Sequence, residues 1–511
     1  MRKNGVMEPR LFLSQSVHLL AALAIGWLVL ASYRWIRRRS EALGAVFAFG
    51  ILARVGIGLA LFWISYLDLP IARSLQTGGG FWHGAADARG YYELAAAAID
   101  PGTPIDPLVP SPFFVRLLAV WMSIVGVSPA SALFLNVCLY VVLVLAIVGC
   151  FSLANQWRLD LPCIVGVAAY SFSPVNVIHG TQPLKDALFC TLTAVACLGV
   201  LGLRGLIYGV SPRATPRAFA AGLGALAAAT FGIAGIRWYD ALILLASLAM
   251  MLAIFAVRGR TTRLPSYLIK SAATLMIVWL AFWAGAGPYS GVLGRYVEDG
   301  PAQFAGMIEL ARTGFLMSGG GTNIVIALRD DAAEGQAHVA RLARRQRDTA
   351  YQREPPPKES RGRPAAPPSN LEEIRTVQNS AARAIPIYLA EQVKVVAIGL
   401  ATIVVPISLL RAFSVMDITG GRGLLAVVDL DTMFQDAAIV LVLGMLWRRR
   451  GTIGDRLPLV VFGVIFSVTT AVLLGYVVTN FGTLWRLRLL VAAPLWVLVV
   501  ALSPRVGRRE S

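Results

Sequence analysis

The sequence predicts an all-α, polytopic integral membrane protein with about eleven transmembrane helices and further helices at the outer membrane surface. Three observations predict this fold class. Of the 511 residues, 57% are hydrophobic and 14% are charged, which leaves too little polar surface for a soluble globule. Apolar runs of about 20 residues, the length that crosses a bilayer core, recur along the chain. Arginines gather at alternate junctions between these runs, as the positive-inside rule requires of cytoplasmic loops.

Each predicted span is an apolar run that ends at charged or turn-forming residues. The run at 433–447 is shorter than the others. In chain order, spans are expected at residues 11–33, 43–66, 131–154, 161–178, 184–203, 218–236, 240–257, 266–288, 433–447, 457–478 and 486–503.

Two further stretches, 113–127 and 389–411, are short or are interrupted by charged residues and a proline. If neither crosses the bilayer, every arginine-rich junction falls on one face, which is then cytoplasmic. We therefore expect both stretches to be interfacial or re-entrant helices on the outer face, with the N-terminus outside and the C-terminus inside. The junctions contain Arg34, Arg37, Arg38, Arg39, Arg204, Arg213, Arg217, Arg258, Arg260, Arg263, Arg448, Arg449, Arg450, Arg505, Arg508 and Arg509.

This topology divides the chain into three parts. Residues 1–288 form an N-terminal transmembrane module whose first outer loop is 67–130. Residues 289–388 form an outer loop, and residues 389–511 form a C-terminal transmembrane module. Within the outer loop, 341–368 is basic, rich in proline and almost free of apolar residues, so we expect a disordered insertion.

Composition also limits the partners. The net charge of +18 comes from basic residues beside apolar spans, which indicates anionic membrane lipids rather than nucleic acid. The five cysteines lie in apolar segments without CxxC spacing, so neither a disulfide framework nor a zinc site is expected. Nucleotide-binding fingerprints are missing from the sequence. Any activated substrate is therefore expected to arrive already activated.

The first outer loop carries the strongest candidate for catalysis. Asp87 follows a predicted in-to-out helix and leads into a segment with Arg89, Tyr91 and Tyr92. An acid at this position is suited to act as general base on an acceptor hydroxyl, and the neighbouring side chains are suited to hold a sugar or lipid chain. The alternative is structural, because aspartate at the start of a helix commonly caps it.

A second group of candidates lies in the outer hairpin between two later spans. His179, Gln182, Lys185 and Asp186 follow Ser173 and Pro174 there. Ionisable groups at membrane depth are costly, so Lys185 is expected to neutralise a lipid phosphate. The alternative is that Asp186 only complements the helix dipole and pairs with Lys185.

Two more outer junctions carry charges. Arg237 and Asp240 lie on the same predicted face as Asp87, and the alternative for them is a local ion pair. Arg486 and Arg488, with Asn480 before them, begin a span at its outer end, against the positive-inside trend. An anionic substrate explains this exception, because arginine grips phosphate bidentately. The alternative is that both snorkel to lipid headgroups.

These residues together resemble the GT-C superfamily of polytopic glycosyltransferases, and the C-terminal motif resembles uncharacterised bacterial membrane proteins of envelope polysaccharide synthesis. Coverage is loose over most of the chain and strongest in 45–240. The motifs are Asp87 with Tyr91 and Tyr92, the stretch from Pro112 to Ser128, Ser173-Pro174 with Lys185-Asp186, and Asn480-Phe481-Gly482-Thr483 with Arg486-Leu487-Arg488.

The resemblance implies that Asp87 is the base and that a polyprenyl-phosphate-linked sugar is the donor. A glycan or lipid-linked acceptor would be glycosylated with inversion, on the outer side of the bacterial inner membrane, in envelope or exopolysaccharide synthesis. Lys185, Arg237, Arg486 and Arg488 would then hold the donor phosphate. The sequence departs from the family in the extra helix at 11–33 and in lacking a second acid beside Asp87, which leaves dependence on Mg²⁺ or Mn²⁺ open.

Two other functions fit the same charges. A polysaccharide polymerase or O-antigen-ligase-like enzyme would use outer arginines to engage two lipid-linked chains without a carboxylate base. A lipid or sugar transporter would use the charges as a translocation site.

Overall fold

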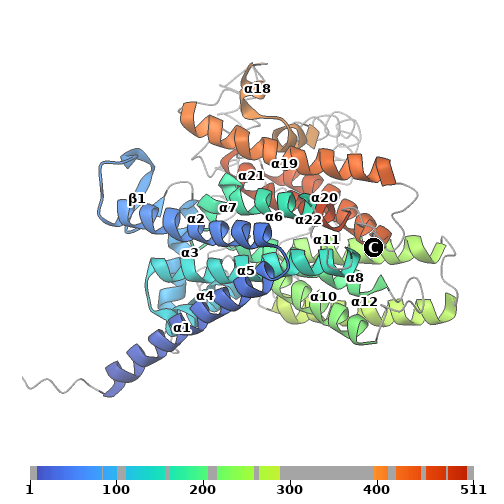
Figure 1. Cartoon of the computed structure of the whole chain (residues 1–511), viewed down its shortest axis with the longest axis horizontal. Coiled ribbons are helices and arrows are strands. Elements are labelled where there is room, and N and C mark those ends of the chain that lie inside the picture. The colour runs from blue at the N-terminus through green and yellow to red at the C-terminus, as the bar shows by residue number, and fades with distance from the viewer. Residues whose placement is uncertain are drawn as a thin grey trace, which may run out of the picture. The chain divides into compact units, whose positions relative to one another are not determined.

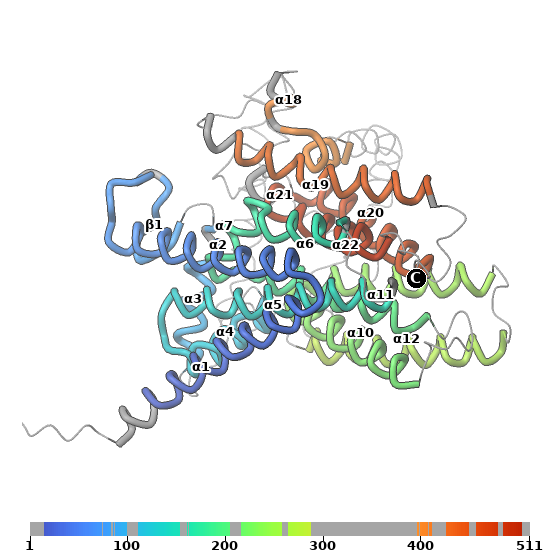
Figure 2. The backbone as a smooth tube through the Cα atoms, viewed as in Figure 1, coloured from blue at the N-terminus to red at the C-terminus, as the bar shows by residue number. Residues whose placement is uncertain are grey.

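The computed structural model of the chain is helical almost throughout (Figures 1 and 2). The all-α expectation is confirmed for the residues that the structure describes. Among these residues the exception is a short antiparallel ribbon of β1 (Gln76–Gly78) and β2 (Phe81–Trp82). The structure describes residues 9–82, 85–99, 111–155, 161–204, 216–257, 264–287, 396–397, 399–412, 422–449, 456–478 and 481–502.

Eight helical segments in the described ranges are long and apolar enough to cross a membrane. They agree with eight of the predicted spans. Six lie in α1 (Pro9–Arg37), α2 (Glu41–Tyr66), α5 (Pro129–Asn155), α10 (Pro216–Ile236), α11 (Trp238–Val257) and α12 (Leu264–Ala286). The other two are α20 (Leu457–Val477) and the segment Leu484–Ala501, which includes parts of α21 (Phe481–Leu487) and α22 (Leu489–Ala501).

The three remaining predicted spans have a different form. The run 161–178 is divided into α6 (Leu161–Phe172) and α7 (Pro174–His179), because a residue before proline disfavours the helical conformation and Ser173 has a ψ of 122°. The run 184–203 becomes α8 (Asp186–Gly202), with 17 residues. The run 433–447 belongs to the much longer α19 (Arg422–Arg449). The predicted count of crossings therefore stays a prediction.

The two ambiguous stretches are short helices where the structure describes them. The first is α4 (Pro112–Val125), whose 14 residues are fewer than a bilayer crossing needs. Of the second, residues 396–397 and 399–404 are helical, and α18 (Ile407–Ala412) follows. The first outer loop also contains a 3-10 turn, Arg73–Leu75, and α3 (Ala86–Ala97).

The chain forms two compact units that differ from the three contiguous predicted parts. One unit comprises Met1–Glu298, Leu430–Thr470 and Arg486–Ser511, and the other comprises Asp299–Asp429 and Ala471–Trp485. The site described below lies entirely in the first unit. The predicted insertion at 341–368 lies outside the described residues.

Glycine contacts bring the helices of the first unit close together. A Cβ built on Gly202 of α8 would lie 2.6 Å from the Cα of Gly222 on α10, so neither position has room for a side chain. α8 also packs against α5 and α22. This close packing fixes the start of α8, at Asp186, beside the end of α10, where Arg237 follows.

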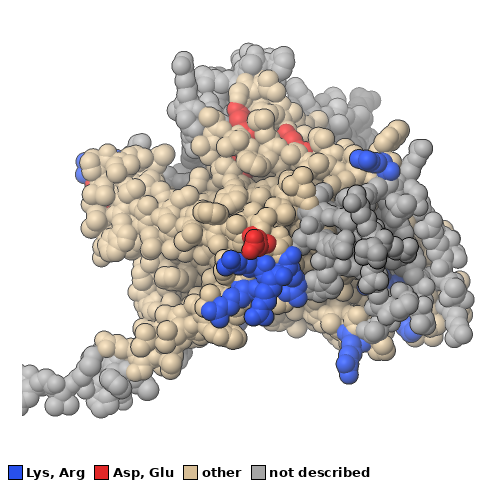
Figure 3. Space-filling model, viewed as in Figure 1, with Lys and Arg blue, Asp and Glu red and all other residues tan. Residues whose placement is uncertain are grey.

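The two ends of α2 have different surroundings. Basic side chains gather on the surface where α1 joins α2, and the arginines there are Arg34, Arg37, Arg38 and Arg39 (Figure 3). At the other end, Ser65 donates a hydrogen bond to the carbonyl of Phe81 at 2.7 Å, and the Trp82 indole donates to the carbonyl of Leu61 at 3.0 Å. These bonds fix Phe81 and Trp82 at the end of α2 that lies away from the arginines.

Candidate functional site

Asp87 lies in the first turn of α3 and does not cap it. The cap position is Ala85, so the capping alternative for Asp87 is wrong. Behind it, the buried face of α3 packs on α4, where Tyr91 meets Phe114 edge to face at 5.3 Å. The carboxylate of Asp87 lies outside this buried face, and its Oδ2 accepts a hydrogen bond from Nη2 of Arg486 at 2.9 Å.

Arg486 connects an exposed acid with a buried one. Its Nε lies 3.1 Å from Oδ2 of Asp186 while its Nη2 contacts Asp87. The side chain of Asp87 is 53% exposed, that of Arg486 is 12% exposed and that of Asp186 is 3% exposed. Arg486 therefore lies where the site passes from solvent into the protein.

Behind Arg486 the ion pairs continue into the interior. Asp186 Oδ1 lies 3.1 Å from Nη2 of Arg237, whose Nη1 lies 3.9 Å from Oδ2 of Asp240. Arg237 and Asp240 are both buried. Together with Lys185, these residues form what we call the charge cluster: Asp87, Lys185, Asp186, Arg237, Asp240 and Arg486.

Lys185 joins the cluster through neutral partners. Its Nζ donates to Oγ of Ser111, which in turn donates to the carbonyl of Ile236 at 3.1 Å. The same Nζ lies 5.6 Å from the centroid of the Tyr91 ring. Burial raises the pKa of Tyr91, so its phenol stays protonated beside the ammonium group.

The cluster contains three acidic and three basic residues, but its hydrogen bonds are incomplete. Nε and Nη1 of Arg237, Nε of Arg486 and Oδ2 of Asp186 are buried without a well-aligned hydrogen bond. Nη1 of Arg237 and Nε of Arg486 lie close to carboxylate oxygens but are not aligned with them as hydrogen bonds. Buried guanidinium N–H groups rarely lack an aligned acceptor, so these atoms are the incompletely satisfied part of the cluster.

Arg488 lies in a different environment from Arg486. Its Nη2 is 2.7 Å from Oδ2 of Asp431, and both side chains are almost fully buried. Asp431 also accepts from Ser173, from the backbone N–H of Val175 at 3.3 Å and from Gln435 at 2.7 Å. The expectation that Arg486 and Arg488 act together on one phosphate is therefore corrected: Arg488 is neutralised inside the helix bundle.

The other predicted residues have contacts of their own. Arg89 is exposed and pairs with Glu93 at 2.8 Å, and Tyr92 is half-buried with its ring 5.6 Å from that of Phe81. His179 and Gln182 are buried, and their side chains contact the carbonyls of Val175 and Gly80. Asn480 lies outside the described residues.

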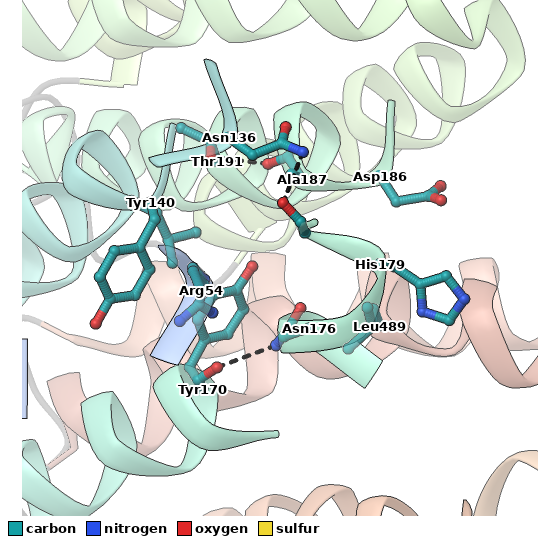
Figure 4. A pocket seen from close by; sticks show the side chains of 12 residues that line it. Arg54, Asn136, Tyr140, Tyr170, Asn176, His179, Asp186, Ala187, Thr191 and Leu489 are labelled. Carbon is teal, nitrogen blue, oxygen red and sulfur yellow. Dashed lines mark hydrogen bonds between the residues drawn. The ribbon is translucent and has the colours of Figure 1, made fainter. Parts of the chain in front are cut away.

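His179 and Asp186 also line a small cavity (Figure 4). Arg54 lines the same cavity, and sequence analysis overlooked it. Ser111, the partner of Lys185, was overlooked as well. Arg54 could have been identified from the sequence, because it is a charged residue near the centre of an apolar run. Nothing in the sequence distinguishes Ser111 from other serines.

The described residues do not form a metal site. No group of three or more His, Cys, Asp or Glu side chains lies close enough to hold an ion in this part of the chain. The acids of the cluster face arginines instead, with Asp87 on Arg486 and Asp186 on both Arg237 and Arg486. This donor set does not fit Mg²⁺ or Mn²⁺.

The fold and the site define an α-helical membrane protein whose ionisable residues meet at one end of its spanning helices. Comparisons with known protein families, curated proteins and solved structures find no match to this chain.

Proposed function

We propose that this protein is a membrane glycosyltransferase of the GT-C type. It transfers a sugar from a polyprenyl-phosphate-linked donor to a glycan or lipid-linked acceptor, at the outer face of the bacterial inner membrane, in envelope or exopolysaccharide synthesis. The observation that carries the proposal is the direct contact between Asp87 and Arg486. It joins an acid suited to be a base to a cation suited to hold phosphate.

The position of the cluster supports the assigned side of the membrane. The exposed arginines where α1 meets α2 are typical of a cytoplasmic junction. The first outer loop is fixed at the opposite end of α2, which is 26 residues long and therefore long enough to cross a bilayer. Asp87 then faces the periplasm or cell exterior, where polyprenyl-linked sugars are used.

In the proposed reaction, the carboxylate of Asp87 takes the proton of the acceptor hydroxyl as its oxygen attacks the anomeric carbon of the donor sugar. The bond between that carbon and the phosphate oxygen breaks, and the phosphate leaves with the electron pair. Arg486 and Arg237 stabilise the charge that develops on the leaving group. Lys185 adds a third cation from the side of Tyr91.

Binding of the donor also prepares the base. Nε of Arg486 is paired with the buried Asp186, which leaves Nη2, on the exposed side of the guanidinium, as the contact of Asp87. A donor phosphate would therefore compete with Asp87 for the N–H groups on that exposed side. A bound phosphate displaces Asp87 and leaves its carboxylate available to the acceptor hydroxyl. Asp87 is 53% exposed, so it can move without disturbing the buried part of the cluster.

The test is product formation by Asp87→Asn protein in membrane vesicles supplied with labelled polyprenyl-phosphate hexoses and pentoses. We expect loss of product at a normal level of folded protein. Glu93→Gln is the matched control, because it removes a similar charge from the same helix at a residue that pairs with Arg89 at 2.8 Å. Full activity of the Asp87→Asn protein rules out the assignment.

One observation favours a second candidate, the polymerase or O-antigen-ligase-like enzyme. Oδ2 of Asp87 already accepts a hydrogen bond from Arg486 at 2.9 Å, so this oxygen is not open to an acceptor hydroxyl. In that case the arginines alone engage the lipid-linked chains. Polymer formation that survives Asp87→Asn but is lost in Arg486→Gln distinguishes this function from the first.

A further inference from the structure

Arg54 is a buried cation that the proposed reaction does not use. It lies near the middle of α2, a membrane-spanning helix, and is 3% exposed. A buried charge costs several kcal/mol unless it is compensated, and ionisable groups inside a membrane protein usually mark a ligand or a partner. The groups around Arg54 therefore have to be accounted for.

Among the described residues, the Arg54 side chain contacts neutral groups. Its Nη1 donates to the carbonyls of Gly50, at 3.1 Å, and Ser171, at 2.8 Å. Its guanidinium carbon lies 4.0 Å from the ring centroid of Tyr140, whose hydroxyl bonds Oγ of Ser171 at 2.7 Å. Within the described ranges, no aspartate or glutamate forms an ion pair with Arg54.

The geometry around Gly50 indicates that this arrangement is specific. A Cβ at Gly50 would lie 2.2 Å from the Tyr140 hydroxyl, so only glycine lets the ring lie over Arg54. Ser171 belongs to the last turn of α6, whose C-terminal end carries about half a negative charge. This partial charge offsets only part of the charge on Arg54.

A cavity lies against Arg54, and several of its lining side chains carry hydrogen-bonding groups. Besides Arg54 they are Asn136, Tyr140, Tyr170, Asn176, His179, Asp186 and Thr191. Asp186 is the one acid among these lining residues, and both of its oxygens are already paired, with Arg237 and Arg486. In Figure 4, the carboxylate of Asp186 points away from Arg54. The cavity has room for about one or two groups the size of a water molecule.

We propose that this cavity binds a small monovalent anion of the size of chloride, with Arg54 as its cation. The sign of the charge on Arg54 and the size of the cavity indicate this ligand. The uncompensated charge beside the cavity is positive, which disfavours a metal ion, and the space is too small for a sugar or a phosphate ester. Asn176 contributes an amide that bonds the carbonyl of Tyr170 through its nitrogen at 3.2 Å, with a second N–H on the same atom.

The proposal predicts stabilisation by halide. Wild-type protein in detergent is unfolded by heat in sodium gluconate, and chloride or bromide is then titrated in at constant ionic strength. Binding to the folded state raises the midpoint in a saturable way, by about 2–4 °C. The Arg54→Gln protein shows no halide-specific shift.

Arg39→Gln is the matched control, because Arg39 also bonds a backbone carbonyl, that of Trp35 at 2.8 Å, and lies 3.6 Å over the Trp35 ring. It lines no part of this cavity, so the control keeps the wild-type halide shift. If Arg54→Gln does not fold, the site of bromide in wild-type crystals decides through its anomalous signal. A midpoint insensitive to halide in wild type, an unchanged shift in Arg54→Gln, or bromide only elsewhere overturns the proposal in favour of bound water.

Discussion

Arg486 donates a hydrogen bond to Asp87 at 2.9 Å, although 399 residues separate the two along the chain. The contact joins the first outer loop to the last membrane segment. Since Asp186 contacts the same guanidinium at 3.1 Å, Arg486 has one exposed and one buried partner. The exposed partner is the one that a ligand can replace at low cost, because exposed ion pairs contribute only about 0.2–1 kcal/mol.

Replacing Asp87 by Asn is expected to strengthen the binding of polyprenyl phosphate while it abolishes transfer. Without the carboxylate, nothing competes with the lipid phosphate for the outer N–H groups of Arg486, and we expect about two- to fivefold tighter binding. Isothermal titration with polyprenyl phosphate in nanodiscs measures the change. Glu93→Gln controls for a general loss of negative charge. An equal gain in both variants contradicts direct competition.

Arg486→Lys is expected to lower the transfer rate by about 100-fold or more. Lysine keeps the charge, but it cannot contact Asp87 and Asp186 with separate nitrogens as the guanidinium does. Initial rates of sugar transfer measure the effect. Arg116→Lys is the control, since Arg116 is an exposed arginine on α4. A rate near wild type in Arg486→Lys would mean that a point charge is sufficient there.

The sequence assigns several of the cluster residues to one predicted membrane face. It placed Asp87, Lys185, Asp186, Arg237 and Arg486 on one membrane face from the alternation of basic and acidic junctions, and the structure brings all five into one cluster. Their pairing could not be predicted, because it depends on how helices far apart in sequence pack. The close contact of α8 with α10 through glycines is of this kind.

Two differences from the sequence analysis have local causes. Residues two positions apart on a helix do not face the same way, so the spacing alone could have predicted that Arg486 and Arg488 lie in different environments. Pro174 likewise marks the break between α6 and α7. Arg488 still required the structure, because only tertiary packing reveals Asp431 as its partner.

The ion pair of Arg488 with Asp431 is expected to act on stability and not on transfer. Asp431→Asn removes the carboxylate that directly contacts the buried guanidinium of Arg488, which costs about 3–5 kcal/mol. The double variant Arg488→Met, Asp431→Leu removes both charges and should recover most of that loss. Thermal unfolding and transfer rates per folded molecule test this. A double variant that folds well but cannot transfer sugar would indicate that Arg488 contributes to substrate binding.

The packing of α8 on α10 is expected to control the geometry of the charge cluster. A Cβ at Gly222 would lie 2.8 Å from the carbonyl oxygen of Gly199 and from the Cα of Gly202, so Gly222→Ala pushes the helices apart. We expect a loss of about 1–3 kcal/mol. Transfer should fall as well, since the end of α10 positions Arg237 against Asp186.

Gly224→Ala on the same helix is the control for that substitution. Its Cβ would meet nothing within 4 Å, so alanine should leave stability unchanged or raise it by up to about 1 kcal/mol through its better helix propensity. Thermal unfolding of both variants and their rates of sugar transfer separate the two positions. Equal behaviour of Gly222→Ala and Gly224→Ala would mean that the α8–α10 contact does not hold the cluster in place.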